Sequence, residues 1–352
     1  DNGLYSPSRG AYGHPIPELI LGSINYFFGS RFANIFCFVL FYISIYLVYY
    51  TFLNKHKNSN LFALLVFSNS LLFFENTSSI DYSIALFLFS LGLFYFFKHF
   101  FYLASIIFGL TIASRANFLL FIYPVIFIFF FYNWKKFDTF LSIKVLSLIT
   151  FVGLIFYIPL FYANNFTLGF LDLPFLDLDN AYNDNNDNNK WYGGPPMNIE
   201  NLLPRFLYKI YLLVGIYSSV VIFFYLKNFF KTKIILEENI YFFTIIFINL
   251  LIFYFMPTKI SIIHPFILFS YILIFKFFSI KQLSIIILLN FFQWFFVYNV
   301  LDIKYKFSDK CSPINAISAS FNVSLEKGIL LNYFDKKQDM TICYSKHMGK
   351  YS

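Results

Sequence analysis

Long apolar runs separated by short polar connections dominate the chain from residue 32 to residue 301. A helix that crosses a bilayer needs about 20 mostly apolar residues, and fewer inside a bundle. The pattern therefore predicts an all-α integral membrane protein, a polytopic bundle of about ten transmembrane helices. The predicted spans are residues 32–53, 61–74, 82–97, 100–114, 117–132, 141–163, 206–226, 240–256, 261–278 and 283–301. The second span is interrupted by Ser68, Asn69 and Ser70, which is typical of a re-entrant or internally buried segment.

Polar segments flank this bundle. Residues 1–31 are predicted to form a first external loop, residues 164–205 a long external loop within the bundle 32–301, and residues 302–352 a small exported C-terminal appendage. Because the chain opens on a charged loop and not on Met, we expect one more transmembrane helix before it. Within the exported tail, Cys311 and Cys343 are compatible both with a disulfide and with two separate thiols.

Composition and charge placement support the membrane assignment. Hydrophobic residues make up 59% of the 352 residues and charged residues only 12%, with a mean hydropathy of +0.65, whereas a soluble domain carries roughly 25% charged residues. The net charge of +8 does not indicate nucleic-acid binding, because the basic residues fall in alternate connections between spans. By the positive-inside rule these connections face the cytoplasm. They contain Lys55 to Lys57, Lys98 and His99, Lys135 and Lys136, Lys227 to Lys233, and Lys276 and Lys281.

The opposite, external side carries the residues that suit phosphate-linked chemistry. A carboxylate at the membrane surface can act as a general base, and Arg and Lys bind phosphate. The acids there are Asp1, Glu18, Glu75 and Asp81, and the cations are Arg9, Arg31, Arg115, Arg205 and Lys259. Each of these residues alone can also be read as an interfacial anchor.

Several of these residues lie in a recognisable order. Asp1 is followed by the run from Tyr5 to Pro15, then by Glu18 and Gly29, before a span opens. This stretch resembles the first external loop of the C-type (GT-C) glycosyltransferase superfamily, polytopic enzymes that use polyprenyl- or dolichyl-phosphate sugars. The mannosyltransferase-like and aminoarabinose-transferase-like members are the ones it resembles. In that superfamily a carboxylate just after the first transmembrane helix is the catalytic acid/base.

Three later segments resemble further parts of the same superfamily. Residues 75–82 are similar to its second external loop, residues 109–117 to its Gly-Leu-x-x-x-x-Arg helix end, and residues 257–265 to its later basic loop. The chain departs from better-known members in two places. Asn2 follows Asp1, so there is no Asp-Glu pair, and residues 75–81 lack an Asp-x-Asp metal motif. The five His and three Cys also lack metal-ligand spacing. No metal and no cofactor is therefore expected.

The resemblance implies a role for each site residue. Asp1 would deprotonate the acceptor hydroxyl or amine, and the lipid phosphate would leave. Arg115 and Lys259, together with Arg9, would stabilise the developing charge, and Glu75 or Asp81 would orient acceptor or sugar. Glu18 would contribute to the same substrate-binding loop. For the histidines two roles remain open: His14 shuttles a proton or hydrogen-bonds its loop, and His264 packs at a helix start or contacts phosphate.

The expected activity is transfer of a sugar from a polyprenyl-phosphate donor to an envelope glycan, lipid or protein acceptor. The expected site is the periplasmic, external face of the inner (cytoplasmic) membrane. An envelope polysaccharide transporter, flippase or polymerase is the alternative, and it would place ionisable residues within its spans. A noncatalytic membrane scaffold is a third possibility. Asn76, Asn165 and Asn322 lie in Asn-x-Ser/Thr sequons predicted on the external side.

Overall fold

The computed structural model describes residues 15–53, 58–69, 72–73, 76, 81–158, 203, 206, 240–255 and 264–303. Throughout these residues the regular structure is helical, and no strand occurs among them. The helices are α1 (Pro15–Phe28), α2 (Ser30–Phe52), α3 (Ser59–Ser68), α5 (Asp81–Phe97), α6 (Phe101–Ser114), the short 3-10 helix η2 (Ala116–Phe118), α7 (Leu119–Tyr132), α8 (Thr139–Ile155), α13 (Ile240–Phe255), α14 (His264–Phe277) and α15 (Ile280–Ile303). An all-α fold is thus confirmed for this part of the chain.

The observed helices follow the apolar runs because polar residues cap or interrupt them. The side chain of Asn58 accepts a hydrogen bond from the amide of Leu61 (3.1 Å) before α3, and that of Asp138 accepts one from the amide of Phe140 (3.2 Å) before α8. Such caps satisfy amides that the first helical turn leaves open. Most predicted boundaries agree with the observed ones within three residues. The span predicted over 141–163 is described as helix only to Ile155, and the span predicted over 206–226 lies outside the described helices.

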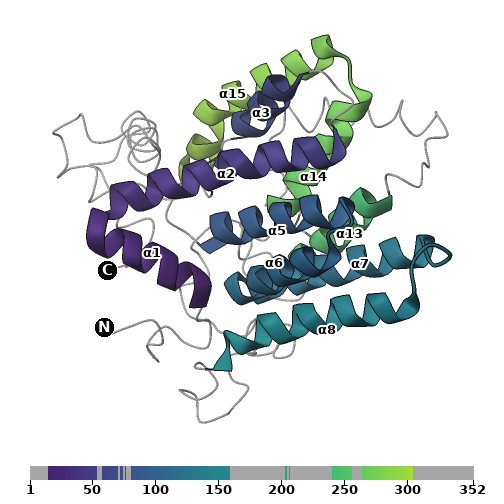
Figure 1. The fold of residues 1–352 in the computed structure, drawn as a ribbon. Helices are drawn as coiled ribbons and strands as arrows, with labels where there is room; N and C mark the ends of the chain where they lie inside the picture. Colours follow the sequence, from purple (N-terminus) through teal and green to yellow (C-terminus); the bar gives the residue numbers. More distant parts are fainter. Residues whose placement is uncertain are drawn as a thin grey trace.

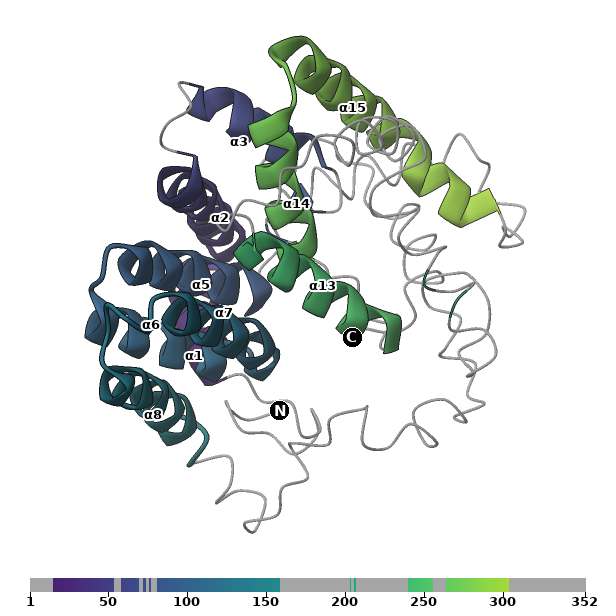
Figure 2. The same ribbon diagram turned by 90° about the vertical axis from the view of Figure 1, so that its right-hand side faces the viewer.

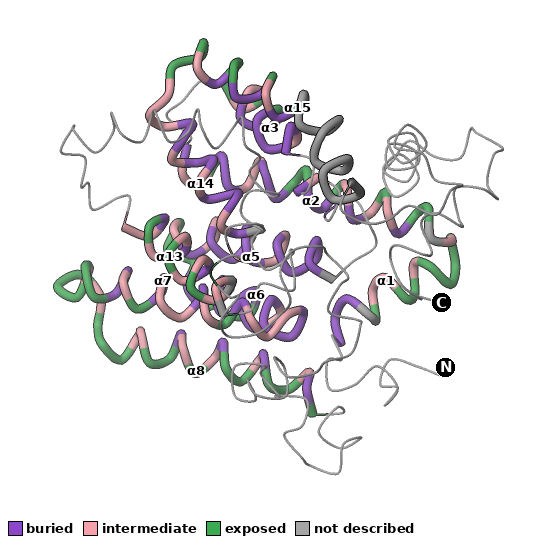
Figure 3. Tube along the Cα trace, turned by 180° about the vertical axis from the view of Figure 1, so that it is seen from behind, coloured by how far each residue is buried: buried purple, intermediate pink, exposed green. Residues whose placement is uncertain are grey.

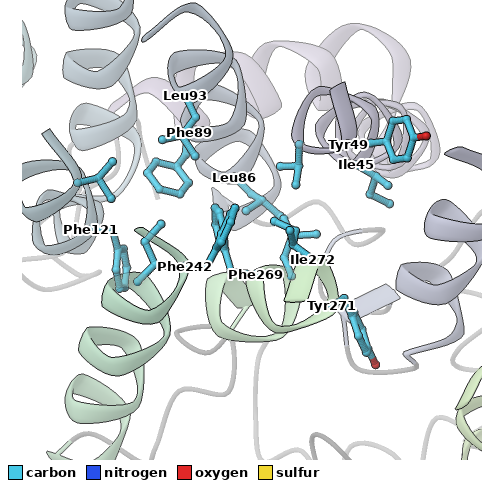
Figure 4. Packing of buried hydrophobic residues seen from close by; sticks show 14 of the residues in the cluster. Ile45, Tyr49, Leu86, Phe89, Leu93, Phe121, Phe242, Phe269, Tyr271 and Ile272 are labelled. Atoms are coloured by element: carbon cyan, nitrogen blue, oxygen red, sulfur yellow. The ribbon is translucent and has the colours of Figure 1, made fainter. Parts of the chain in front are cut away.

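Helices α2, α5, α6, α7 and α8 run roughly side by side (Figure 1), and α13, α14 and α15 extend to the other side of α5 (Figure 2). Four phenylalanines join these groups. Phe89 of α5, Phe121 of α7, Phe242 of α13 and Phe269 of α14 are all fully buried (Figure 4). The ring of Phe269 lies 6.0 Å from that of Phe89 and 6.1 Å from that of Phe242. One aromatic core therefore connects both groups of helices.

The ends of α2, α5 and α7 and the start of α13 gather at one end of the bundle, which carries the described turns 98–100 and 133–138. Phe97, at the end of α5, has its ring 5.2 Å from that of Phe52 at the end of α2 and 5.9 Å from that of Phe129 near the end of α7. The ring of Tyr241 at the start of α13 is 5.3 Å away. Because α6 and α8 return from this end, Arg115 lies at the opposite one. The turns at Lys98 and at Lys135 and Lys136 therefore share one end of the bundle, as their charge predicts, and Arg115 lies at the other.

The break predicted in the second span is present. Helix α3 ends at Ser68, and Asn69 adopts an extended backbone (ψ 110). Its side-chain oxygen accepts a hydrogen bond from the amide of Leu72 (2.9 Å) and its carbonyl accepts one from the amide of Phe73 (2.9 Å), so Asn69 caps a new helical turn. The break is buried between helices: the Asn290 amide of α15 donates to Ser68 Oγ (2.9 Å) and to the Tyr271 hydroxyl (3.1 Å).

Two features differ from the sequence-based expectation. Residues 15–28, part of the expected loop 1–31, form helix α1, because proline is tolerated in a first helical turn, where amides need no intrahelical partner. The expected set of ten membrane spans is also not confirmed by helix length. Among the described residues only Arg31–Phe52 is both long and apolar enough to cross a membrane; most other apolar helices have 10–17 residues, while α15 has 24 residues.

Candidate functional site

A small second core brings the predicted site segments together. Its buried members are Ile16 of α1, Leu40 of α2, Ile84 of α5 and Ala113 of α6. Ile16 lies two residues before Glu18, Ile84 three residues after Asp81, and Ala113 two residues before Arg115. Packing among four apolar side chains therefore fixes the backbones of three candidate site residues at the same end of the bundle.

Arg115 is the candidate residue whose side chain the structure describes. It ends α6 with an extended backbone (φ −156, ψ 108), and its amide donates to the carbonyl of Thr111 (2.8 Å). Its guanidinium carbon lies 3.9 Å from the ring centroid of Tyr82, the second residue of α5. A cation is favoured at a helix C-terminus, where the last carbonyls carry partial negative charge, and a face-on aromatic ring stabilises it further. The guanidinium is thus held in a defined orientation.

The end of α6 is also fixed from α8. The hydroxyl of Tyr157, which follows α8, donates to the carbonyl of Ile112 (3.0 Å), and both residues are buried. That carbonyl belongs to the last turn of α6, whose carbonyls have no intrahelical partner. The Tyr157 hydroxyl therefore satisfies an open acceptor three residues before Arg115.

Asn117 follows Arg115 by two residues and carries a second notable group. Its side-chain oxygen is buried and makes no hydrogen bond among the described residues. A buried acceptor without a donor costs about 1–3 kcal/mol, so such a group in a polar environment is suited to a ligand that supplies a donor. In the sequence, Asn117 stands out only as the last residue of the segment 109–117. Neither its burial nor the ring of Tyr82 under Arg115 can be read from spacing alone.

The segment that carries Glu75 is anchored beside α5. Asn76 is fully buried, and its side-chain amide donates to the carbonyl of Leu72 (2.8 Å). The backbone carbonyl of Asn76 accepts a hydrogen bond from the hydroxyl of Ser83 (3.0 Å). In the folded structure the side-chain amide of Asn76 is therefore enclosed by protein.

The remaining candidate residues divide into two groups. The following lie outside the described residues: Asp1, Arg9, His14, Glu75 and Lys259. For three others the backbone is described and the side chain is not: Glu18 within the first turn of α1, Asp81 at the start of α5, and His264 at the start of α14. The first turn of α14 packs on α13, where the side-chain oxygen of Asn249 accepts a hydrogen bond from the amide of Phe266 (2.7 Å).

Among the described residues, no group of three or more His, Cys, Asp or Glu side chains is arranged to hold a metal ion. Comparison with known proteins gives no further assignment: no protein family, curated protein or solved structure matches the chain. The residues around Arg115 are therefore the best-defined candidate site in the described part of the chain.

Proposed function

We propose that the chain is a membrane-embedded glycosyltransferase that moves a sugar from a polyprenyl-phosphate donor to an envelope or lipid acceptor at the external face. The observation that carries this proposal is the geometry of Arg115. A guanidinium oriented by an aromatic ring, at the end of an apolar bundle, is suited to bidentate contact with a phosphate. The converging starts of α1 and α5 bring the backbones of Glu18 and Asp81 to the same end.

Insertion in a bilayer is part of this proposal, and the outward surface supports it. Large apolar side chains are exposed on several helices, among them Val39 of α2 (44%), Ile106 of α6 (43%), and Phe151 and Leu154 of α8 (65% and 53%). In a bilayer these side chains would contact the acyl chains of the lipids. Helix α8, at the edge of the bundle, shows green, exposed stretches along its length (Figure 3).

In the proposed reaction the carboxylate of Asp1 takes a proton from the acceptor hydroxyl as its oxygen attacks the anomeric carbon. The bond from that carbon to the phosphate oxygen breaks, and the phosphate leaves with the electron pair. Arg115 stabilises this growing charge, an interaction that is stronger in the transition state than in the bound substrate. The buried oxygen of Asn117 would accept a hydrogen bond from a sugar hydroxyl.

The alternative, an envelope polysaccharide transporter, flippase or polymerase, has one structural feature in its favour. Broken helices with buried polar contacts mark the binding sites of many transporters, and the break after α3 meets Tyr271 and Asn290. The buried polar residues in the described helices are, however, Ser, Thr and Asn. Coupled transport normally needs an ionisable group in the bundle interior, so the transferase remains the better supported function.

The decisive experiment uses a host that lacks the gene and compares envelope glycans and polyprenyl-phosphate sugars by mass spectrometry. Wild type should add a glycan mass that Asp1→Asn does not add, and the lipid-linked donor should accumulate with the variant. Identical profiles from two folded proteins would refute transfer by Asp1 and favour transport or a scaffold.

A matched pair of variants tests the Arg115 geometry. Arg115→Lys keeps the charge but loses the planar group that stacks on Tyr82, so we expect kcat to fall roughly 10- to 100-fold. Lys281→Arg is the control, because Lys281 is exposed on the first turn of α15 and belongs to a connection assigned to the opposite side, and its turnover should stay within about twofold of wild type. Full turnover by Arg115→Lys would remove Arg115 from the mechanism.

A further inference from the structure

Two turns at the end of the bundle opposite Arg115 form one surface, which we call the lysine turns: residues 98–100 between α5 and α6, and residues 133–138 between α7 and α8. His99 joins them. Its ring lies 5.6 Å from the ring of Phe137 and 6.1 Å from that of Phe129. Its backbone has a positive φ of 66°, which is uncommon for a residue other than glycine. The amide of Phe100 donates to the carbonyl of Tyr95 (3.0 Å), as in a Schellman cap.

The lysine turns carry a positive charge that the described residues do not neutralise. Lys98, Lys135 and Lys136 are exposed, and Lys144 is exposed one helical turn further along, on α8. The carboxylate on the turns is that of Asp138, which accepts a hydrogen bond from the amide of Phe140 at the start of α8. None of these four lysines forms an ion pair with another residue in the part of the chain that the structure describes, whereas an exposed phosphate would be attracted to all of them.

Exposed aromatic rings accompany these lysines. Trp134 is 70% exposed, and Phe131 and Phe140 are 64% and 58% exposed. The Lys144 ammonium lies 4.4 Å from the ring centroid of Phe140, and the Lys135 ammonium lies 5.7 Å from that of Trp134. Most of the α7–α8 turn is exposed, and it shows as a green loop in Figure 3. Trp and Lys side by side at the end of apolar helices are the composition of a membrane–water boundary.

Helices α7 and α8 are somewhat shorter than the hydrocarbon core of a bilayer. Helix α7 has 14 residues and α8 has 17, which at 1.5 Å per residue gives about 21 Å and 25 Å. The hydrocarbon core is about 30 Å thick. The aromatic side chains of the turns therefore complete the apolar length of these helices, and the lysine ammonium groups extend beyond them.

We infer that the lysine turns bind the headgroups of anionic phospholipids. The occupant is a lipid because charge and apolar rings are combined: the phosphate contacts the ammonium groups, and the acyl chains lie against the rings and the outer faces of α7 and α8. This inference rests on the membrane insertion included in the proposed function. It does not depend on glycosyl transfer.

The test uses the full chain purified in a nonionic detergent and offered equal amounts of phosphatidylglycerol and phosphatidylcholine. Native mass spectrometry then counts the bound lipids. Each lysine near an anionic surface contributes about fivefold in affinity at moderate salt. Wild type should therefore retain phosphatidylglycerol at least tenfold more than phosphatidylcholine, and 0.5 M NaCl should largely abolish this preference.

A pair of triple variants separates charge from fold. Changing Lys98, Lys135 and Lys136 all to Gln should reduce the preference to within about twofold of parity. Changing the same three residues to Arg should keep it. Equal retention of both lipids by wild type, or an unchanged preference in the Gln variant, would overturn the inference while leaving the glycan assay untouched. In the same way, a negative result in the glycan assay would leave the lipid preference unaffected. The two proposals can therefore be refuted separately.

Discussion

The contact between α6 and α8 is the most sensitive point of the described fold, and Gly109→Ala tests it. A methyl group built on Gly109 would lie 2.5 Å from the Cβ and 2.6 Å from the Cγ1 of Val152, and 3.1 Å from the backbone nitrogen of Gly153. Ordinary carbon contacts are about 3.5–4.0 Å long. Neither a Cβ nor a backbone nitrogen can turn away, so the two helices would have to separate.

The change in unfolding free energy of Gly109→Ala is the difference between the cost of overpacking and the gain in helix propensity. Overpacking a rigid contact costs about 1–3 kcal/mol, and the upper part of this range applies because the blocking atoms belong to, or adjoin, the α8 backbone. Replacing glycine by alanine within a helix returns about 1 kcal/mol. We therefore expect Gly109→Ala to lower stability by about 2 kcal/mol, or roughly 4 °C in the unfolding midpoint.

The chain offers two matched controls. Gly22 of α1 is exposed, and a methyl group there meets nothing within 4 Å, so Gly22→Ala should raise the midpoint by about 1–2 °C. At Gly92 the methyl group meets Cε1 and Cδ1 of the Phe108 ring at 2.5 Å and 2.6 Å. Because a side-chain ring is displaced more easily than a Cβ or a backbone nitrogen, the loss should be smaller than at Gly109. Midpoints measured in detergent by intrinsic fluorescence should follow the order Gly22→Ala, wild type, Gly92→Ala, Gly109→Ala. If Gly109→Ala matched or exceeded Gly22→Ala, the close packing of α6 on α8 would be refuted.

Two further predictions concern single contacts. Asn290→Leu removes the hydrogen bonds to Ser68 and Tyr271 and should lower stability by about 2 kcal/mol, at about 1 kcal/mol for each buried hydrogen bond. The double variant with Tyr271→Phe should lose less stability than the two single variants lose together. Fully additive losses in the thermal midpoint would contradict a shared cluster. His99 has a φ of 66°, a conformation that only Gly adopts without strain. His99→Gly should therefore be about 1 kcal/mol more stable than His99→Ala. A higher thermal midpoint for His99→Ala would contradict the positive φ of this turn.

Much of the fold can be predicted from the sequence because apolar runs and their interruptions determine it. The predicted spans 82–97, 100–114 and 117–132 correspond to α5, α6 and α7 with its preceding η2. Each is bounded by a polar group such as Lys98 and His99, or by Arg115, which cannot enter an apolar core unaccompanied. The same residues predict which ends of the helices meet, since charge is confined to alternate connections.

The sequence is less informative where a short polar stretch folds. Helix α1 follows a Pro- and Gly-rich segment that is typical of a loop, yet Ile16, Ile20 and Ile24 recur every four residues and so lie on one helical face. That spacing is the feature of the sequence that indicates helix α1. The pairing of Arg115 with Tyr82 carries no such signal, because it depends on how α5 and α6 pack and not on any local pattern.

The abundance of phenylalanine explains burial but not specificity. Rings such as Phe89, Phe121 and Phe269 fill the core, and an aromatic pair contributes only about 0.5–1.5 kcal/mol beyond its buried area in many alternative geometries. A bundle made of such residues alone would pack in several ways. Gly109 permits one close approach of α6 to α8, and Asn290 satisfies its hydrogen bonds in one register of α15 against α3. Small and polar residues therefore select the native packing from those that the aromatic residues allow, and substitutions at these few positions should perturb the fold more than substitutions at any single exposed ring.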